Sequence, residues 1–138
     1  MLFAMSLTKI IVHGIRMKIR EALGRPDPAS KLPIPVAERR DYSAEELASY
    51  DGSDPHQPIL LAARGRIFDV TRSRGFYGPD GPYGCFAGKD CSRALAKVST
   101  KPEDCVADLS GLTDSELEKL DDWIETFSAK YDEIGRVI

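Results

Sequence analysis

Apolar residues recur at helical spacing near the C-terminus of this chain. Between residues 113 and 131 they lie three or four positions apart, which is typical of an amphipathic helix with one buried face. Thr113 and Glu116 form a capping-box pattern at its start. The segment is therefore the clearest helix that the sequence predicts. Its apolar stripe consists of Leu117, Leu120, Ile124, Phe127 and Tyr131, with Trp123 beside it.

Two short apolar runs in the middle of the chain predict a β-hairpin. Residues 59–63 and 67–70 flank Gly65, and a glycine between two such runs is typical of a hairpin turn. The next segment, residues 75–88, holds five of the eleven glycines and two prolines. We therefore expect a loop there, without helix or strand.

Capping signals predict two further short helices. Ser43 and Glu46 form a second capping box, and the helix that they open is expected to end near Asp51. Asp90 can accept hydrogen bonds at the start of a helix that runs to Val98. Short helices, short strands and one long loop together indicate an α+β fold.

The first 23 residues have a pattern of their own. Lys9, His13, Arg16 and Arg20 share a narrow sector of a helical wheel, and apolar residues cover most of the rest. We favour an interfacial membrane anchor for such a basic amphipathic helix. An acid-poor start is also typical of a mitochondrial targeting segment, and a helix docked on the domain or on a partner is the third interpretation.

Residues 24–40 hold four of the nine prolines. Proline removes a backbone donor and disfavours helix at the residue before it, so we expect an extended linker. The folded domain is then predicted to span residues 41–138.

Composition and charge narrow the classes of function. Of the 138 residues, 42% are hydrophobic and 30% are charged, which indicates a folded domain. Apolar runs stay well short of the ~18 residues that a membrane-spanning helix needs. Residues 1–40 carry eight bases and three acids, whereas residues 41–138 carry eleven bases and nineteen acids. The excess of acids in residues 41–138 argues against a nucleic-acid partner, because phosphate contacts need a clustered basic surface.

Cysteine and histidine are few. Cys85, Cys91 and Cys105 form no C-x-x-C pair, so we expect reduced thiols that pack in the domain, with no disulfide framework or zinc site. His13 and His56 are the only histidines and leave little for a histidine-based metal site or a Ser-His-Asp triad. These counts argue against most hydrolase chemistry.

The glycine-rich segment carries the candidate chemistry. Phe76, Tyr77, Tyr83 and Phe86 stand among small residues, without a phosphate-binding motif. Such aromatics can enclose a flat apolar ligand, with the glycines allowing close approach of the backbone. They can equally fill the core while the glycines form turns.

Segments spread over residues 41–137 match one known pattern. They are Asp41–Ser43, Tyr50–Gly52, Ile67–Thr71, Phe76–Gly84, Phe86–Asp90, Ser92–Ala96, Leu109–Leu112, Trp123, Phe127, Lys130–Tyr131 and Gly135. This region resembles the cytochrome b5-like haem/steroid-binding domain of the membrane-associated progesterone receptor family. Lys101–Asp104 is most similar to the plant and fungal steroid-binding members. The resemblance implies the cytochrome b5-like fold, a small sheet with short helices around a haem pocket.

The resemblance also implies site residues. In that family a tyrosine of the Gly-Pro-Tyr-Gly segment is the axial haem ligand, so Tyr83 is expected to bind the iron of haem b. Tyr77, Asp90, Lys130 and Tyr131 match family positions linked to haem binding. Tyr131 also fits a core tyrosine, and Lys130 also fits a solvated lysine. A phenolate ligand would favour ferric over ferrous iron, which makes an electron carrier the weakest interpretation.

The function implied by the resemblance is non-catalytic. We expect a five-coordinate, tyrosinate-ligated ferric haem protein that supports sterol or steroid metabolism through cytochrome P-450 monooxygenases, with a haem-stacked homodimer as a further implication. The alternative is a steroid-binding or protein-docking module that needs no haem. Many members begin with a membrane-spanning helix, whereas this chain begins with the amphipathic segment. Peripheral attachment to the cytosolic face of the endoplasmic reticulum is therefore expected, with the mitochondrion as the alternative.

Overall fold

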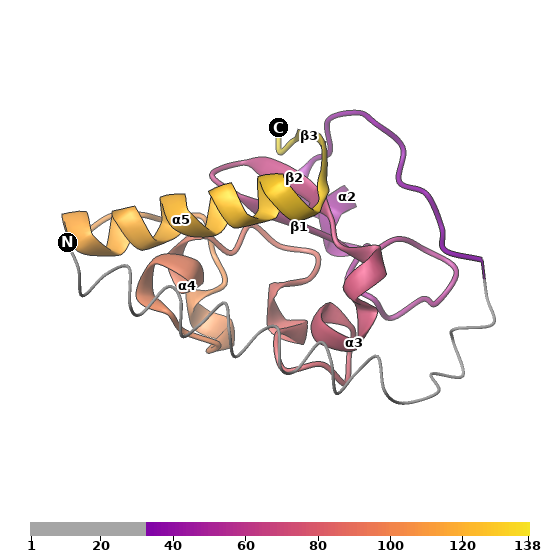
Figure 1. The fold of residues 1–138 in the computed structure, drawn as a ribbon, viewed down its shortest axis with the longest axis horizontal. Helices are drawn as coiled ribbons and strands as arrows, with labels where there is room; N and C mark the ends of the chain where they lie inside the picture. Colours follow the sequence, from indigo (N-terminus) through magenta and orange to yellow (C-terminus); the bar gives the residue numbers. More distant parts are fainter. Residues whose placement is uncertain (1–32) are drawn as a thin grey trace.

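Short helices and a small antiparallel sheet alternate along the chain, as predicted. The computed structural model describes residues 33–138, so the predicted N-terminal helix (1–23) and the first part of the predicted linker lie outside the described residues. The helices and strands are α2 (Ala44–Ala48), β1 (Leu60–Ala63), β2 (Arg66–Asp69), α3 (Arg74–Tyr77), α4 (Ser92–Lys97), α5 (Asp114–Lys130) and β3 (Asp132–Arg136) (Figure 1). The α+β prediction is confirmed.

The predicted hairpin forms the first two strands of the sheet. The strands lie in the order β1-β2-β3, with antiparallel pairing throughout, and Leu61 faces Phe68 in the register. Arg64 and Gly65 form the turn with φ angles of 49° and 72°, as a tight hairpin turn requires. The strand β3 was not predicted, and it follows α5 directly at the C-terminal end (Figure 1).

Strand β1 is buried on both faces, which explains its unbroken apolar run. Leu61 and Ala63 belong to the larger hydrophobic cluster, which includes the apolar side chains of α4 and α5. Leu60 and Ala62 belong to a second cluster on the other face, with Ala37, Tyr42 and Leu47 among its members. Successive side chains of a strand point to opposite faces, so one short strand joins two cores.

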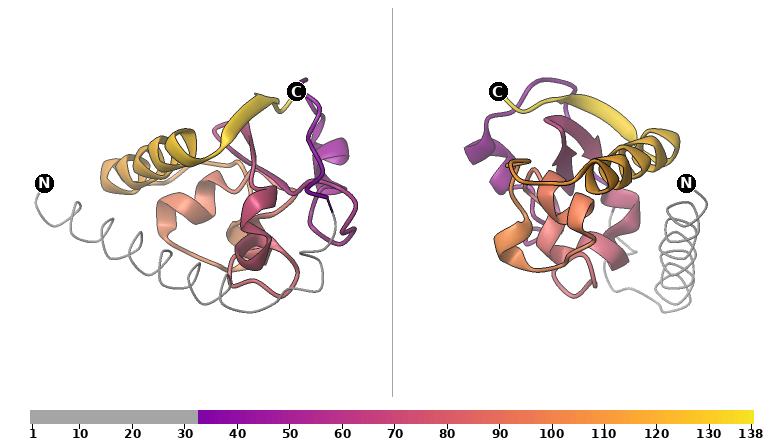
Figure 2. Two further views of the ribbon diagram at one scale, coloured as in Figure 1. Left: turned by 45° about the vertical axis from the view of Figure 1, so that its right-hand side comes forward. Right: turned by 90° about the vertical axis from the view of Figure 1, so that its left-hand side faces the viewer.

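Helix α5 begins at the predicted capping box. The Thr113 hydroxyl accepts from the Glu116 backbone, and the Glu116 side chain accepts from the Thr113 backbone. The helix lies beside α4, and the two views of Figure 2 show it running along one side of the domain. The buried side chains of α5 are Leu120, Trp123, Ile124 and Phe127, whereas Leu117 is only partly buried.

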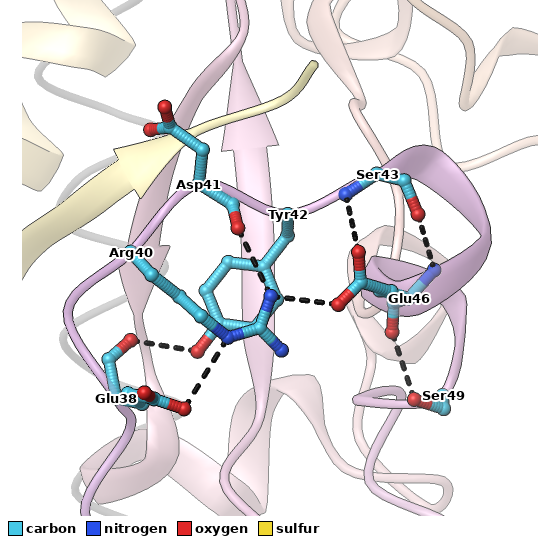
Figure 3. Close-up of polar contacts among 7 residues, drawn as sticks. All are labelled: Glu38, Arg40, Asp41, Tyr42, Ser43, Glu46 and Ser49. Atoms are coloured by element: carbon cyan, nitrogen blue, oxygen red, sulfur yellow. Dashed lines mark hydrogen bonds and ion pairs between the residues drawn. The ribbon is translucent and has the colours of Figure 1, made fainter.

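The second predicted capping box is also present. Ser43 accepts from the backbone of Glu46, whose carboxylate accepts from the Ser43 backbone (Figure 3). The same carboxylate binds the Arg40 guanidinium at 2.7 Å, and that guanidinium lies 3.8 Å from the centre of the Tyr42 ring. The Tyr42 hydroxyl donates to the Glu38 carbonyl at 2.7 Å. These contacts hold the residues before position 41 against the domain.

The glycine-rich segment departs from the prediction of a loop without helix. Residues Arg74–Tyr77 form α3, and Gly84–Phe86 form a 3₁₀ turn. The Gly78 backbone N–H donates to the Arg74 carbonyl at 2.7 Å and closes α3. Burial of Phe76 and Tyr77 stabilises this single turn, so tertiary packing outweighs the low helix propensity of the segment. A Cβ at Gly81 would lie 2.2 Å from the Phe76 carbonyl oxygen, so close backbone packing requires glycine there.

Candidate functional site

Aromatic rings from two distant parts of the chain form one cluster. Helix α3 provides Phe76 and Tyr77, and the following segment provides Tyr83 and Phe86. Tyr131 joins them from the end of α5, with its ring centroid 6.5 Å from that of Tyr77. Phe76, Tyr77 and Phe86 are buried, whereas Tyr83 and Tyr131 are partly buried. The structure therefore brings together three of the predicted site residues, all of them tyrosines.

Tyr83 stacks with two phenylalanine rings. Its centroid lies 5.1 Å from that of Phe76 and 5.4 Å from that of Phe86, and both pairs are stacked. The Tyr83 backbone N–H donates to the Phe76 carbonyl at 3.0 Å, and the Phe86 N–H donates to the Tyr83 carbonyl at 3.0 Å. These contacts fix Tyr83 through its ring and its backbone.

The hydroxyl of Tyr83 is free of protein partners within the described residues. Burial alone raises the pKa of Tyr83, with no hydrogen bond or charge contributing. Its phenol is therefore neutral at physiological pH, and its oxygen remains available to an added ligand.

Tyr77 and Tyr131 meet edge to face, at an interplanar angle of 81°. The hydroxyl of Tyr131 shares a hydrogen bond of 2.7 Å with the Ser73 hydroxyl. Burial raises the pKa of Tyr77 well above its usual value, and the nearby Tyr131 adds to the shift. Burial also raises the pKa of Tyr131, although Ser73 and Arg72 act in the opposite direction. Both phenols stay neutral and polar inside an otherwise apolar cluster.

Ser73 is a site residue that sequence reasoning missed. It lies 58 positions before Tyr131, and nothing in the local pattern connects the two. Only the packing of α5 against the segment before α3 brings these hydroxyls together. The sequence holds no signal that would have revealed the pair.

Lys130 and Asp90 lie apart from these ring contacts. Lys130 is exposed as the last residue of α5, and its side chain has no hydrogen bond or ion pair with another described residue. Asp90 accepts from the Gly65 backbone at 2.9 Å and from the Ser92 backbone at 3.1 Å. Its carboxylate therefore ties the hairpin turn to the start of α4. The haem-binding roles of both residues stay predictions.

The donor set of the cluster fits a haem. A phenol oxygen without a protein partner, on a ring fixed in apolar surroundings, becomes on loss of its proton a hard anionic ligand of the kind that ferric iron accepts. The rings of Phe76, Tyr77 and Phe86 supply an apolar setting for a flat macrocycle. These features agree with the expectations from the resemblance.

The fold and the aromatic cluster define a haem/steroid-binding domain of the cytochrome b5 type. The family pattern described as "Cytochrome b5-like Heme/Steroid binding domain" matches residues 43–131. A solved structure from Arabidopsis thaliana, described as having a cytochrome b5 like fold, is 49% identical with a TM-score of 0.66, and the match covers 71% of this chain and 90% of that one. The chain belongs to the cytochrome b5-like haem/steroid-binding family, and the predicted fold and family are confirmed.

Relatives of the chain are named as membrane steroid-binding proteins and as a progesterone receptor component. Membrane steroid-binding protein 1 of Oryza sativa subsp. japonica is 54% identical over 114 residues, which are 82% of this chain and 49% of the relative. Membrane-associated progesterone receptor component 2 of Homo sapiens is 44% identical over 118 residues, which are 83% of this chain and 52% of the relative. The chain thus spans about half the length of these relatives. Within the described residues, no helix has the length and apolar character to cross a membrane.

Proposed function

We propose that the domain binds ferric haem b with the phenolate of Tyr83 as the axial ligand. One observation carries the proposal: the Tyr83 ring is stacked with two phenylalanine rings, and no protein group uses its hydroxyl within the described residues. Burial raises the pKa of the unliganded phenol, so ionisation at neutral pH needs the charge of the iron.

The other site residues have supporting roles in this proposal. Tyr77 supplies a buried ring beside Tyr83, with centroids 6.3 Å apart, and Tyr131 orients a hydroxyl through Ser73. Lys130 is an exposed cation next to Tyr131 in sequence and can approach a haem carboxylate. When bound, the haem would supply a ferric centre held by a hard oxygen ligand and difficult to reduce. The role is therefore one of binding, without catalysis by the domain itself.

The proposed cellular role draws support from the names of the relatives and from the sequence. The relatives are named as membrane steroid-binding proteins and as a progesterone receptor component, which supports a sterol or steroid ligand and a membrane location. We assign this chain to the support of cytochrome P-450 monooxygenases in sterol metabolism. The basic amphipathic residues 1–23 would attach it peripherally to the endoplasmic reticulum, with the mitochondrion as the alternative. Stacking of two haems would allow a homodimer.

Titration with ferric haem tests the ligand assignment. The chain, Tyr83→Phe and Tyr50→Phe are titrated side by side and followed by absorption spectroscopy. Tyr50 is a matched control because it is a partly buried tyrosine of the second hydrophobic cluster. We expect saturable binding by the native chain and by Tyr50→Phe, and at least a tenfold weaker affinity for Tyr83→Phe. Equal haem affinity of all three proteins would contradict the role of Tyr83.

The same titration distinguishes haem binding from the alternative function, a steroid-binding module that needs no haem. The relatives' names support steroid binding, and the apolar cluster suits a steroid ring system without requiring iron. Absence of saturable haem binding in the native chain, together with binding of progesterone by the haem-free protein, would favour the haem-independent module.

A further inference from the structure

Two of the cysteines, Cys85 and Cys105, are neighbours near the segment that contains Tyr83. Cys85 follows Tyr83 by two positions and sits within the 3₁₀ turn Gly84–Phe86. Cys105 directly follows the 3₁₀ turn Pro102–Asp104. Both thiols are free, and neither takes part in the proposed haem ligation.

Their hydrogen bonds bring both thiols to the same short stretch of backbone. The Cys85 thiol donates to the Thr100 carbonyl at 3.3 Å, and the Cys105 thiol donates to the next carbonyl, that of Lys101, at 3.5 Å. Cys85 is also among the neighbouring groups that raise the pKa of Cys105. Cys105 is a member of the larger hydrophobic cluster, and Cys85 packs against it.

The two thiols differ in accessibility. Cys85 is partly exposed, whereas Cys105 is 4% exposed. Burial, with the neighbouring Cys85 thiol, raises the pKa of Cys105 to about 12. A small oxidant therefore reaches Cys85 first, and Cys105 is protected from direct attack.

The third cysteine has a different environment. Cys91 is fully buried, and its thiol donates to the Ala62 carbonyl at 3.4 Å. Burial raises its pKa well above the usual value, which makes it an inert thiol. It therefore serves as an internal control.

We propose that Cys85 and Cys105 are a reversible redox pair that forms an intramolecular disulfide when a peroxide oxidises Cys85. The Cys85 thiol loses its proton, and the thiolate attacks one peroxide oxygen as the O–O bond breaks. The departing hydroxide takes up a proton, which gives a sulfenic acid and water. The Cys105 thiol then attacks the Cys85 sulfur and loses its proton as the S–O bond breaks, which releases a second water. Two thiols are oxidised, and one hydrogen peroxide is reduced to two waters.

The disulfide would join the segment of Tyr83 covalently to the segment of residues 99–105. It would close a loop that includes α4 and would restrict movement of the Tyr83 backbone. The proposal stands apart from haem binding, because its evidence is the position of the two thiols.

Peptide mapping after oxidation tests the pair. The reduced, haem-free chain is treated with hydrogen peroxide, alkylated and cleaved with trypsin. Cleavage after Lys89 and Arg93 separates the three cysteines into different peptides. We expect a linked pair of peptides containing Cys85 and Cys105, lighter by two hydrogen atoms than the sum of the two, that dithiothreitol separates. Cys91 should be recovered as an alkylated thiol.

Two variants complete the test. Cys91→Ala should still form the bridge, whereas Cys85→Ser should form none and leave Cys105 as a thiol. Circular dichroism of each variant checks that the fold is retained. Oxidation of Cys85 to sulfinic acid with Cys105 unchanged would overturn the proposal, and so would disulfides that form only between chains.

Discussion

At the scale of single residues, the proposed role of Tyr83 depends on what surrounds its ring. Stacking on Phe76 and Phe86 fixes its direction, while its hydroxyl is left without a partner in the described part of the chain. Tyr131 differs from Tyr83 because its hydroxyl shares a hydrogen bond with Ser73. Tyr77 differs because packing buries it. The phenol best placed to accept a ligand is therefore that of Tyr83.

One residue holds backbone strain that a substitution should relieve. Val98 ends α4 in the left-handed conformation, with φ 54° and ψ 49°, and its side chain is 45% exposed. That conformation costs a residue other than glycine roughly 1–2 kcal/mol, and the greater freedom of unfolded glycine offsets part of the gain. We expect Val98→Gly to raise the free energy of unfolding in urea by about 0.5–1 kcal/mol.

Val106 offers the matched control, because it is 42% exposed and its φ is not positive. Val106→Gly should lower the free energy of unfolding. If Val98→Gly is destabilising to the same extent, the strain at Val98 is absent. The sequence alone could not reveal this strain, since valine is an uncommon residue at a left-handed helix end and the helix seemed to continue through it.

At the scale of elements, short-range sequence patterns correctly predicted the helix starts and the hairpin turn. The capping boxes at Ser43 and Thr113, and the glycine turn at Gly65, are short-range patterns, and the structure contains each of them. Helix α3 and strand β3 depend on partners far away in sequence. The first is stabilised by burial of Phe76 and Tyr77, and the second by pairing with β2, so composition and periodicity missed both.

The hydrogen bond between Ser73 and Tyr131 connects the end of α5 to the segment before α3. We expect Ser73→Ala and Tyr131→Phe each to lower the free energy of unfolding by about 1 kcal/mol, because each removes the same partly buried hydrogen bond. The double variant should then be less destabilised than the sum of the two. Urea unfolding of the four proteins measures this coupling.

Tyr50→Phe combined with Ser73→Ala is the control for that cycle, because Tyr50 belongs to the other hydrophobic cluster. Those two changes should be additive. Additive effects of Ser73→Ala and Tyr131→Phe as well would show that the two hydroxyls do not stabilise each other in solution.

At the scale of the whole molecule, two hydrophobic clusters share strand β1, and the aromatic site belongs to the larger one. The apolar pattern predicted a folded core, but not its division across the sheet, because a continuous apolar run does not assign faces. The resemblance indicated the three tyrosines of the site. The sequence could not predict the contacts among these tyrosines. Only the structure shows that Asp90 binds the hairpin turn and that Lys130 is exposed to solvent.

Ionisable groups limit the pH range over which the fold is stable, carboxyl groups in acid and buried tyrosine and cysteine in alkali. Hydrogen bonds lower the pKa of several carboxyl groups below their values of 3.8 or 4.5, so the unfolded chain binds more protons in acid. Their stabilisation is complete above about pH 5 and is lost as the pH falls through the lowered pKa values. They are Glu46, Asp104, Asp108, Glu116 and Glu133.

Buried tyrosine and cysteine act in the opposite direction. The pKa values of Tyr77 and Cys91 are raised by burial, so their stabilisation is present below the unfolded values of 10.0 and 9.0 and is lost above them. We expect the thermal midpoint of the reduced chain to be nearly constant between about pH 5 and pH 8.5 and to fall on both sides. A midpoint that rises below pH 4 would contradict the assignment of these shifts.

The most direct test of the central claim is resonance Raman spectroscopy of the ferric haem complex. Excitation into a phenolate-to-iron charge-transfer band should enhance phenolate vibrations in the native protein and in Tyr77→Phe. Tyr83→Phe, loaded with haem at high concentration, should lack them. Phenolate vibrations that persist in Tyr83→Phe, or that disappear in Tyr77→Phe alone, would show that another residue binds the iron.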